Sequence, residues 1–381
     1  MSLRRIVRVG WVACLCIALA ACDGAATPAP PTPPVAQSSN APTTQSTNKP
    51  TIAPSAVPTL APTATLRPTP TPAPTLKKLT DGKCCTQPFW SADAKQVLFI
   101  DKPDAKAPTG IYAVDVAAPT APKLFTERIA FYTSDMQYTQ SLDATFTTIE
   151  RVSDGQKWKI RTGGRTVLLS PDRTRVVWSE TPQTNAPFET RVTTVMGANF
   201  DGSDARPITQ LLRGGVTAWL DNQRLLLTAR QNRNSQEVTL YVYSLADGST
   251  TELAKSERLR SAFPSPTGEW VLYSINFDQN AEQSGLWLIH PDGSARKKLD
   301  FFGAYQWRDG HRLIYVPLEL DQPSHVFWEY DANTGARRPL TNPALTPFKI
   351  ANGDWVLSPD GTKIVFLNAA DLNLWLWELV K

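Results

Sequence analysis

The stretch "LSPDGTKIVF", Leu357–Phe366, places a Ser-Pro-Asp-Gly turn between two short apolar segments. An Asp in this position accepts hydrogen bonds from the backbone amides that follow it, and Gly tolerates a positive φ angle. The pattern therefore predicts a tight β-hairpin. Similar stretches recur along the chain: "WSADAKQVLF" (Trp90–Phe99), "LSPDRTRVVW" (Leu169–Trp178), "WLDNQRLLL" (Trp219–Leu227), "PSPTGEWVLY" (Pro264–Tyr273) and "WRDGHRLIY" (Trp307–Tyr315).

A second hairpin pattern follows at a regular distance, as in "LYVYSLADGSTTELA" (Leu240–Ala254) and "LWLIHPDGSARKKLD" (Leu286–Asp300). Two hairpins make a four-stranded unit of about 40 to 50 residues, which is the size of a propeller blade. The sequence therefore predicts an all-β fold, a β-propeller of four-stranded blades. A weaker hairpin around Asp143 favours seven blades, and six blades remain the alternative.

The Ser-Pro-Asp-Gly turns and the Asp-Gly…Leu-Thr endings of these repeats resemble the TolB-type β-propeller family. The resemblance covers everything after residue 75 and implies a ring of blades with a binding face. Two departures stand out: Thr267 replaces the turn Asp in one repeat, and the region Tyr138–Thr166 holds one degenerate repeat at best.

The last repeat lacks a fourth strand, because "LNLWLWELVK" ends the chain after a third one. The segment "LKKLT", Leu76–Thr80, is similar to the outer strands "ARKKLD" and "RRPLT" of other repeats. We therefore expect this N-terminal strand to complete the last blade and close the ring, with Leu79 buried at the join. Closure of this kind covers a strand edge that would otherwise stay unpaired.

Residues 1–21 begin with three arginines and continue into a short apolar segment, which is typical of an export signal. Leu19, Ala20, Ala21 and Cys22 match the lipobox, so the resemblance to bacterial lipoproteins implies that Cys22 is lipidated. Residues 22–75 are rich in Pro and Thr and are predicted to form a disordered tether, and residues 76–381 the propeller. The expected location is the outer face of the cytoplasmic membrane, on the periplasmic side in a diderm cell.

The composition argues against several functions. Removal of the signal lowers the net charge from +4 to about +1, so no nucleic-acid partner is expected. Cys84 and Cys85 are the only cysteines beyond the lipobox, either as a vicinal disulfide or as two thiols. His290 and His311 are expected in short turns and His325 at the opposite face, so neither a metal site nor a cofactor is predicted.

Two functional classes remain. No Gly-x-Ser-x-Gly motif is present, which favours a non-catalytic module that binds a protein, a peptide or a glycan. The alternative is a hydrolase or lyase that uses carboxylates in the central channel, and two or more carboxylates meeting there would favour it. The repeated turn residues Asp93, Asp172, Asp221, Asp309 and Asp360 are interpreted as turn formers, and Trp90, Trp219 and Trp307 as packing between blades.

The connections between second and third strands, such as "NFDQNAEQS", are long and polar, and in a propeller they share one face with the loops that join blades. Binding groups tend to lie on such loops, and aromatic residues beside arginines often anchor an interface. In the alternative interpretation Phe131, Phe301 and Phe302 only cap blade cores. The predicted ligand-binding residues are Arg128, Phe131, Tyr132, Arg213, Phe301, Phe302 and Lys349.

Overall fold

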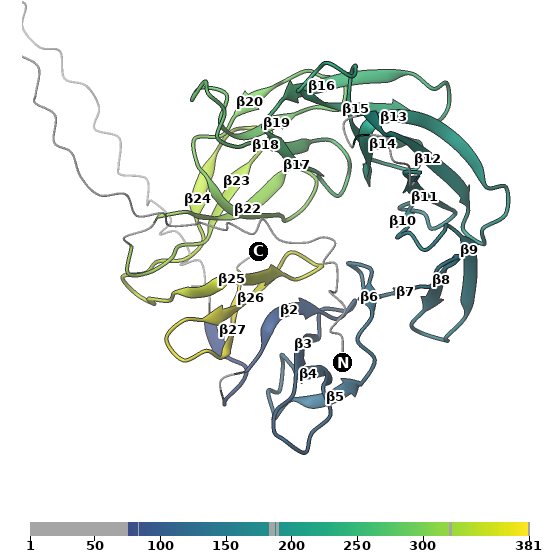
Figure 1. The fold of residues 1–381 in the computed structure, drawn as a ribbon. Coiled ribbons are helices and arrows are strands. Elements are labelled where there is room, and N and C mark those ends of the chain that lie inside the picture. The colour runs from purple at the N-terminus through teal and green to yellow at the C-terminus, as the bar shows by residue number, and fades with distance from the viewer. Residues whose placement is uncertain (1–74, 83, 183–186, 188–189, 320–321, 380–381) are drawn as a thin grey trace, which may run out of the picture. The chain divides into compact units, whose positions relative to one another are not determined.

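The computed structural model describes residues 75–82, 84–182, 187, 190–319 and 322–379. Every regular element with described bounds is a β-strand, and the strands form five four-stranded sheets and one seven-stranded sheet. All paired strands are antiparallel, and the sheets lie around a common centre (Figure 1). The all-β, propeller-like arrangement predicted from the repeats is therefore present.

Each four-stranded sheet is ordered from an inner first strand to an outer fourth strand. One sheet contains β2 (Thr86–Trp90), β3 (Gln96–Asp101), β4 (Gly110–Asp115) and β5 (Lys123–Thr126). The next contains β6 (Phe131–Tyr132), β7 (Tyr138–Leu142), β8 (Phe146–Arg151) and β9 (Lys157–Arg161). Two later sheets contain β17 (Leu259–Pro264), β18 (Val271–Ile275), β19 (Gly285–Ile289) and β20 (Lys297–Lys298), then β21 (Gly303–Trp307), β22 (Arg312–Pro317), β23 (Trp328–Asp331) and β24 (Arg337–Pro339).

The seven-stranded sheet contains β10 (Leu168–Leu169), β11 (Arg175–Glu180), β12 (Val192–Asn199), β13 (Arg206–Trp219), β14 (Arg224–Arg230), β15 (Val238–Ser244) and β16 (Thr250–Ser256). Its long strand β13 pairs with β12 through its first half and with β14 through its second half. The register shifts between Leu212 and Gly215, where the strand changes partner. A Cβ atom on Gly214 would lie 1.9 Å from the carbonyl oxygen of Thr228, so this crossing requires glycine.

The predicted hairpin turns are held by the residues that define them. In the Ser-Pro-Asp-Gly turn between β25 (Ile350–Leu357) and β26 (Lys363–Asn368), Asp360 accepts hydrogen bonds from the Thr362 amide at 3.1 Å and its hydroxyl at 2.8 Å. Burial raises the pKa of Asp360, but the hydroxyls of Ser358 and Thr362 outweigh it and lower the pKa to about 2. The interpretation of the repeated Asp residues as turn formers is confirmed at the other positions as well: Asp93, Asp172, Asp221 and Asp309.

The first hairpin turn of the weak repeat lies one strand earlier in the chain than the sequence predicted. The inner turn of the β6–β9 sheet contains Thr133 and Asp135, and their side chains are hydrogen-bonded in the manner of the Ser–Asp pairs elsewhere. Asp143 lies instead in the turn between β7 and β8. Because Thr replaces Ser and Met136 (φ 56°) takes the position that Gly361 occupies in the last repeat, the sequence pattern is hidden although the turn is kept.

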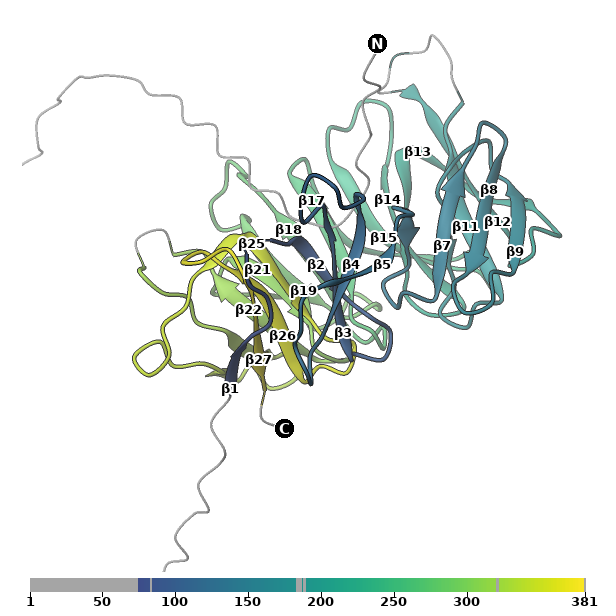
Figure 2. The same ribbon diagram turned by 90° about the horizontal axis from the view of Figure 1, so that it is seen from below.

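The N-terminal strand closes the last sheet, as predicted. This strand, β1 (Thr75–Lys78), pairs with β27 (Leu374–Glu378) on the side opposite β26 (Figure 2). Leu79 follows the strand, is 3% exposed, and donates its amide to the Leu374 carbonyl at 2.8 Å. The strand begins one residue before the predicted segment, and Leu79 and Thr80 continue it as buried chain.

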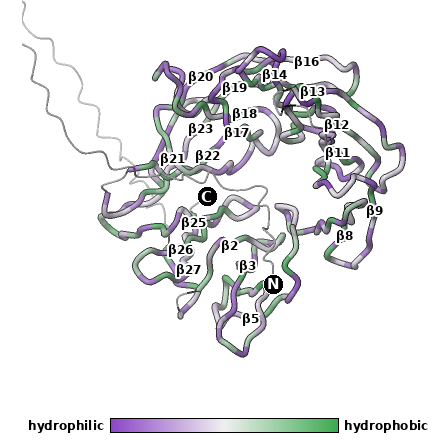
Figure 3. The backbone as a smooth tube through the Cα atoms, viewed as in Figure 1, coloured by the Kyte–Doolittle hydropathy of each residue, from purple (hydrophilic) through white to green (hydrophobic). Residues whose placement is uncertain are grey.

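Hydrophobic residues occur along the strands (Figure 3), and the hydrophobic cores lie between neighbouring sheets. Second strands such as β3 are almost wholly apolar, so Val97 and Phe99 belong to one core and Leu98, on the other face of the sheet, to the next.

Trp90 and Trp307, at the ends of first strands, donate their indole N–H to the adjoining sheet, and Trp219, at the end of β13, donates to β10 of the same seven-stranded sheet. Trp90 bonds to the Val356 carbonyl at 3.2 Å, Trp219 to Leu168 at 3.0 Å, and Trp307 to Phe263 at 3.3 Å. The prediction that these repeat-locked tryptophans pack between blades is confirmed for Trp90 and Trp307.

Candidate functional site

The antiparallel order of the strands gives the ring two faces. We call the long-loop face the one formed by connections between second and third strands and between successive sheets. It includes residues 79–82, 84–85, 102–109, 127–130, 143–145, 231–237, 257–258, 276–284, 299–302, 340–349 and 369–373. The opposite, short-turn face carries turns such as 91–95, 152–156, 290–296, 308–311 and 358–362.

Exposed apolar side chains gather on the long-loop face. In the described part of the chain 13 large hydrophobic residues are exposed, and Phe277 (84%) and Leu345 (79%) are the most exposed. Of the remainder, Val152 lies on the short-turn face, Leu124 and Phe125 on β5, and Phe263 on β17. Ile100, Leu142 and Val192 lie at or near the ends of β3, β7 and β12. The connections of the long-loop face carry the other six: Ile129, Phe277, Phe302, Leu318, Leu345 and Leu372.

Three of the predicted ligand-binding residues lie near β6. Arg128 is exposed and pairs with Glu150 at 2.6 Å. Tyr132 is half-buried against the small core around Leu98, where burial raises its phenol pKa and the nearby Arg128 guanidinium opposes the rise. Phe131 and Tyr132 belong to the innermost strand β6 and not to the joining loop in which they were expected. The reason is the hidden turn at Thr133, which begins the hairpin earlier than the sequence pattern indicated.

The other predicted residues lie at separate points of the same face. Arg213, with φ 46°, lies where β13 changes partner. Phe302 is 42% exposed, whereas Phe301 stacks on Tyr315 with ring centroids 3.6 Å apart. The Phe301 contact agrees with the alternative interpretation that this residue packs against a blade core. Lys349 is exposed and donates to the Gln322 carbonyl at 3.2 Å.

The histidines divide between the faces. His290 and His311 occupy short-turn positions, and His325 lies on the long-loop side, where its Nδ1 accepts the Ile350 amide at 3.1 Å. Burial, and then the charge of Lys349, lowers the pKa of His325. Within the described ranges, no three His, Cys, Asp or Glu side chains come together as a group that could hold a metal ion. No helix among the described residues is long and apolar enough to span a membrane.

The innermost strands contain few acidic residues. Among the described first strands and the second half of β13, Asp354 of β25 is the one acidic residue. It follows Asn352 (φ 55°) and Gly353 (φ 73°), where the register of β25 shifts against β26. Burial raises the pKa of Asp354, and a hydrogen bond from the Gln87 amide opposes the rise. The innermost strands therefore supply a single carboxyl group toward the centre.

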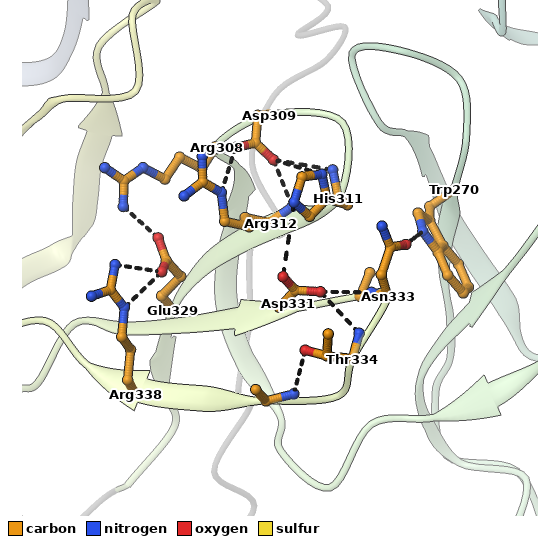
Figure 4. Close-up of polar contacts among 12 residues, drawn as sticks. Trp270, Arg308, Asp309, His311, Arg312, Glu329, Asp331, Asn333, Thr334 and Arg338 are labelled. Carbon is orange, nitrogen blue, oxygen red and sulfur yellow. Dashed lines mark hydrogen bonds and ion pairs between the residues drawn. The ribbon is translucent and has the colours of Figure 1, made fainter. Parts of the chain in front are cut away.

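The short-turn side of the β21–β24 sheet holds a dense polar network (Figure 4). Glu329 is buried between two arginines: it pairs with Arg308, whose side chain is also 7% exposed, and with Arg338 at 2.8 Å. His311 lies between Asp309 (3.6 Å) and Asp331 (3.8 Å). The carboxylates of this network are paired with neighbouring cations or turn amides, so the network connects the strands and turns of this sheet.

Comparisons with known proteins identify the fold. No protein-family model and no curated protein matches the chain. An oligogalacturonate lyase in complex with manganese is 13% identical over 81% of this chain and 97% of its own, with a TM-score of 0.53. The oligogalacturonate lyase of Vibrio parahaemolyticus is 11% identical over 81% and 98%, with a TM-score of 0.51. A putative TolB from Agrobacterium tumefaciens is 16% identical over 68% and 81%, with a TM-score of 0.37. At these identities the likeness shows an all-β, propeller-like fold.

Sequence reasoning missed Phe277, the most exposed apolar residue of the described chain. It is the one aromatic residue in the polar loop "NFDQNAEQS" and has φ 56°, so its backbone turns sharply at the loop's start. A lone phenylalanine among polar residues was the available signal. Leu345, in the connection before β25, was also missed, because the apolar residues of that connection follow no strand periodicity that would separate an exposed one from buried Phe348.

Proposed function

We propose that this protein is a non-catalytic binding module that docks a protein, peptide or glycan on its long-loop face. The observation that carries the proposal is the one-sided distribution of exposed apolar side chains. Six of the 13 large exposed hydrophobic residues in the described chain lie in the connections of the long-loop face, against one, Val152, in the turns of the short-turn face. Single exposed apolar residues are ordinary on protein surfaces, but an accumulation on one face is typical of an interface.

The point at which the N-terminal region joins the ring supports the same face. Thr75 pairs with Glu378 at the end of β27, and β27 runs from the long-loop connection 369–373 toward the short-turn face. The chain therefore enters the ring on the short-turn face. If residues 22–75 act as the proposed tether to a membrane, the long-loop face is the one directed away from the attachment point and open to a partner.

The proposed function includes a lipid anchor at Cys22 on a TolB-like propeller, with the seven-stranded sheet counted as two blades that share β13. This division gives each half one inner strand and makes seven blades in all.

For the anchor we expect Cys22→Ser to abolish incorporation of a radiolabelled fatty acid and to leave the protein unprocessed or outside the membrane fraction. Label that persisted in the variant would contradict lipidation at this residue.

The docking face is tested by cross-linking and pull-down with matched surface variants. We expect Phe277→Ser, Tyr132→Ala, Arg213→Ala and Phe302→Ala each to weaken capture of the partner, since interface anchors typically contribute about 1–2 kcal/mol or more each. Val152→Ser on the short-turn face is the control. His290 and Lys297 are less suitable controls on that side, because His290 stacks on Trp270 and Lys297 lies over the same ring, so changing either would also alter packing.

Once a partner is isolated, calorimetric titration of these variants gives affinities. Loss of affinity restricted to Val152→Ser, with all four long-loop variants unchanged, would exclude the proposed face. Circular dichroism and melting curves of each variant show whether the fold is retained, so that a binding defect is separated from unfolding.

A further inference from the structure

Cys84 and Cys85 form a disulfide bond in the connection between β1 and β2. Because β1 is the outermost strand of the last sheet and β2 the innermost strand of the first, this connection joins the two ends of the ring. Cys85 is 4% exposed, and Cys84 is half-buried. Both cysteines pack in the core between these sheets, together with Leu79, Trp90 and Leu374.

Thr80 links the disulfide to the closing strand. Its Oγ1 accepts the Leu374 amide at 2.9 Å, and the Cys85 Sγ lies 3.9 Å from the same oxygen. The Leu79 amide donates to the Leu374 carbonyl at 2.8 Å. The Cys85 sulfur therefore lies against the contacts that hold the end of β1 to the start of β27.

The backbone of Cys85 has φ 84°, a left-handed value that a residue with a side chain adopts when its surroundings impose it. A bond between adjacent cysteines closes a small ring that includes the peptide between them, so it restrains this backbone directly. Without the bond, the ordinary preference for negative φ would draw Cys85 away from this conformation.

We propose that the Cys84–Cys85 disulfide is a reversible redox site that a dithiol can reduce. In its oxidised form the cysteine pair stabilises the pairing of β1 with β27 that closes the ring. A thiolate of the dithiol attacks Sγ of Cys84, the less buried sulfur; the S–S bond breaks, and Cys85 leaves as a thiolate that takes a proton. The second thiol of the dithiol then attacks the mixed disulfide and releases Cys84. Two protein thiols form, the dithiol becomes a disulfide, and two electrons pass to the protein.

Reduction has a local structural consequence. Cys85 relaxes from its left-handed conformation, and the contacts of Thr80 and Leu79 with Leu374 lose their support. We expect the closing strand to open about tenfold more often in the reduced protein, since a left-handed residue is disfavoured by roughly a factor of ten. The connection lies on the long-loop face, where a dithiol can reach Cys84.

The test measures amide hydrogen exchange in the full-length protein before and after dithiothreitol treatment. Amides of Leu76–Thr80 should exchange about tenfold faster after reduction, while those of Leu225–Ala229 in β14, whose core contains no residue of the closing strand, serve as an internal control and stay unchanged. Alkylation followed by peptide mass spectrometry reads the state of the two cysteines separately from Cys14, Cys16 and Cys22.

Two variants separate redox control from simple packing. In the double variant Cys84→Ser with Cys85→Ser, the amides of Leu76–Thr80 should exchange at the fast rate, and dithiothreitol should not change that rate. Cys84→Ser with Cys85→Gly should return to slow exchange without any disulfide, because glycine accepts the left-handed conformation. The proposal is overturned if alkylation finds two free thiols in the untreated protein, or if complete reduction leaves exchange in Leu76–Thr80 unchanged. The wild-type measurement decides the matter even where a variant does not fold.

Discussion

Deletion of Leu76–Thr80 is expected to lower the melting temperature of the protein by on the order of 10 °C. The deletion removes most of the β1 pairing with β27 and the buried side chain of Leu79, which by itself contributes about 1.5–3 kcal/mol. It also uncovers Leu374 and the edge of β27, which are covered by the closing segment. The loss is large because one short segment holds the last sheet and seals its join with the first.

The measurement is a thermal unfolding curve followed by circular dichroism, with calorimetry to test cooperativity. Deletion of residues 61–65, which precede the described fold and are equal in number, is the matched control and should leave the melting temperature unchanged. If the two deletions gave the same melting temperature, β1 would contribute nothing to closure. Exposure of the β27 edge should also promote association of the Leu76–Thr80 deletion, visible by light scattering.

Replacement of Glu329 by Gln is expected to cost about 3–5 kcal/mol of unfolding free energy. Its carboxylate is 7% exposed and pairs with Arg308, which is equally buried, and with Arg338 at 2.8 Å. The variant would leave the buried Arg308 guanidinium without a counter-charge inside the sheet. Removing one partner of a buried pair is more damaging than removing both, because the remaining charge is desolvated and unpaired.

Urea unfolding of the wild type and three variants tests this account. Glu282→Gln, at an exposed position on the long-loop face, is the control and should change stability by less than about 0.5 kcal/mol. The double variant Glu329→Met with Arg308→Met should be more stable than Glu329→Gln, since it removes both charges and keeps the volume filled. Equal stability of Glu329→Gln and the wild type would mean that the Arg308 charge is compensated in another way.

The position of the long connections was predictable from the sequence, but the orientation of individual side chains on them was not. Long polar connections indicated the face, and the residues chosen there, such as Arg128 and Phe302, are exposed on it. Phe301 was predicted in the same way but stacks on Tyr315, because its orientation depends on a strand that lies next to it in space. Whether an isolated loop residue faces solvent or a core is decided by neighbours that sequence periodicity does not reveal.

The sequence by itself determined the hairpins, their turn residues and the closing strand. The hydrogen bonds of Ser358, Asp360 and Thr362 span only a few residues, so the local pattern carries the structure. Even the distant pairing of the N-terminal strand with the last sheet was predictable, because Leu76–Thr80 repeats the pattern of other outer strands and the last repeat lacked one.

Tertiary structure alone decided how the repeats merge and which groups meet. The pairing of β13 with both β12 and β14 depends on the close approach of Gly214 to the backbone of Thr228 on β14. No turn motif in the sequence predicts this contact. Likewise, Glu329 pairs with Arg308, 21 residues away, because their strands bring both side chains into one buried space. Such contacts follow from the packing of sheets against one another, and the energies involved depend on burial, which exists only after the ring has formed.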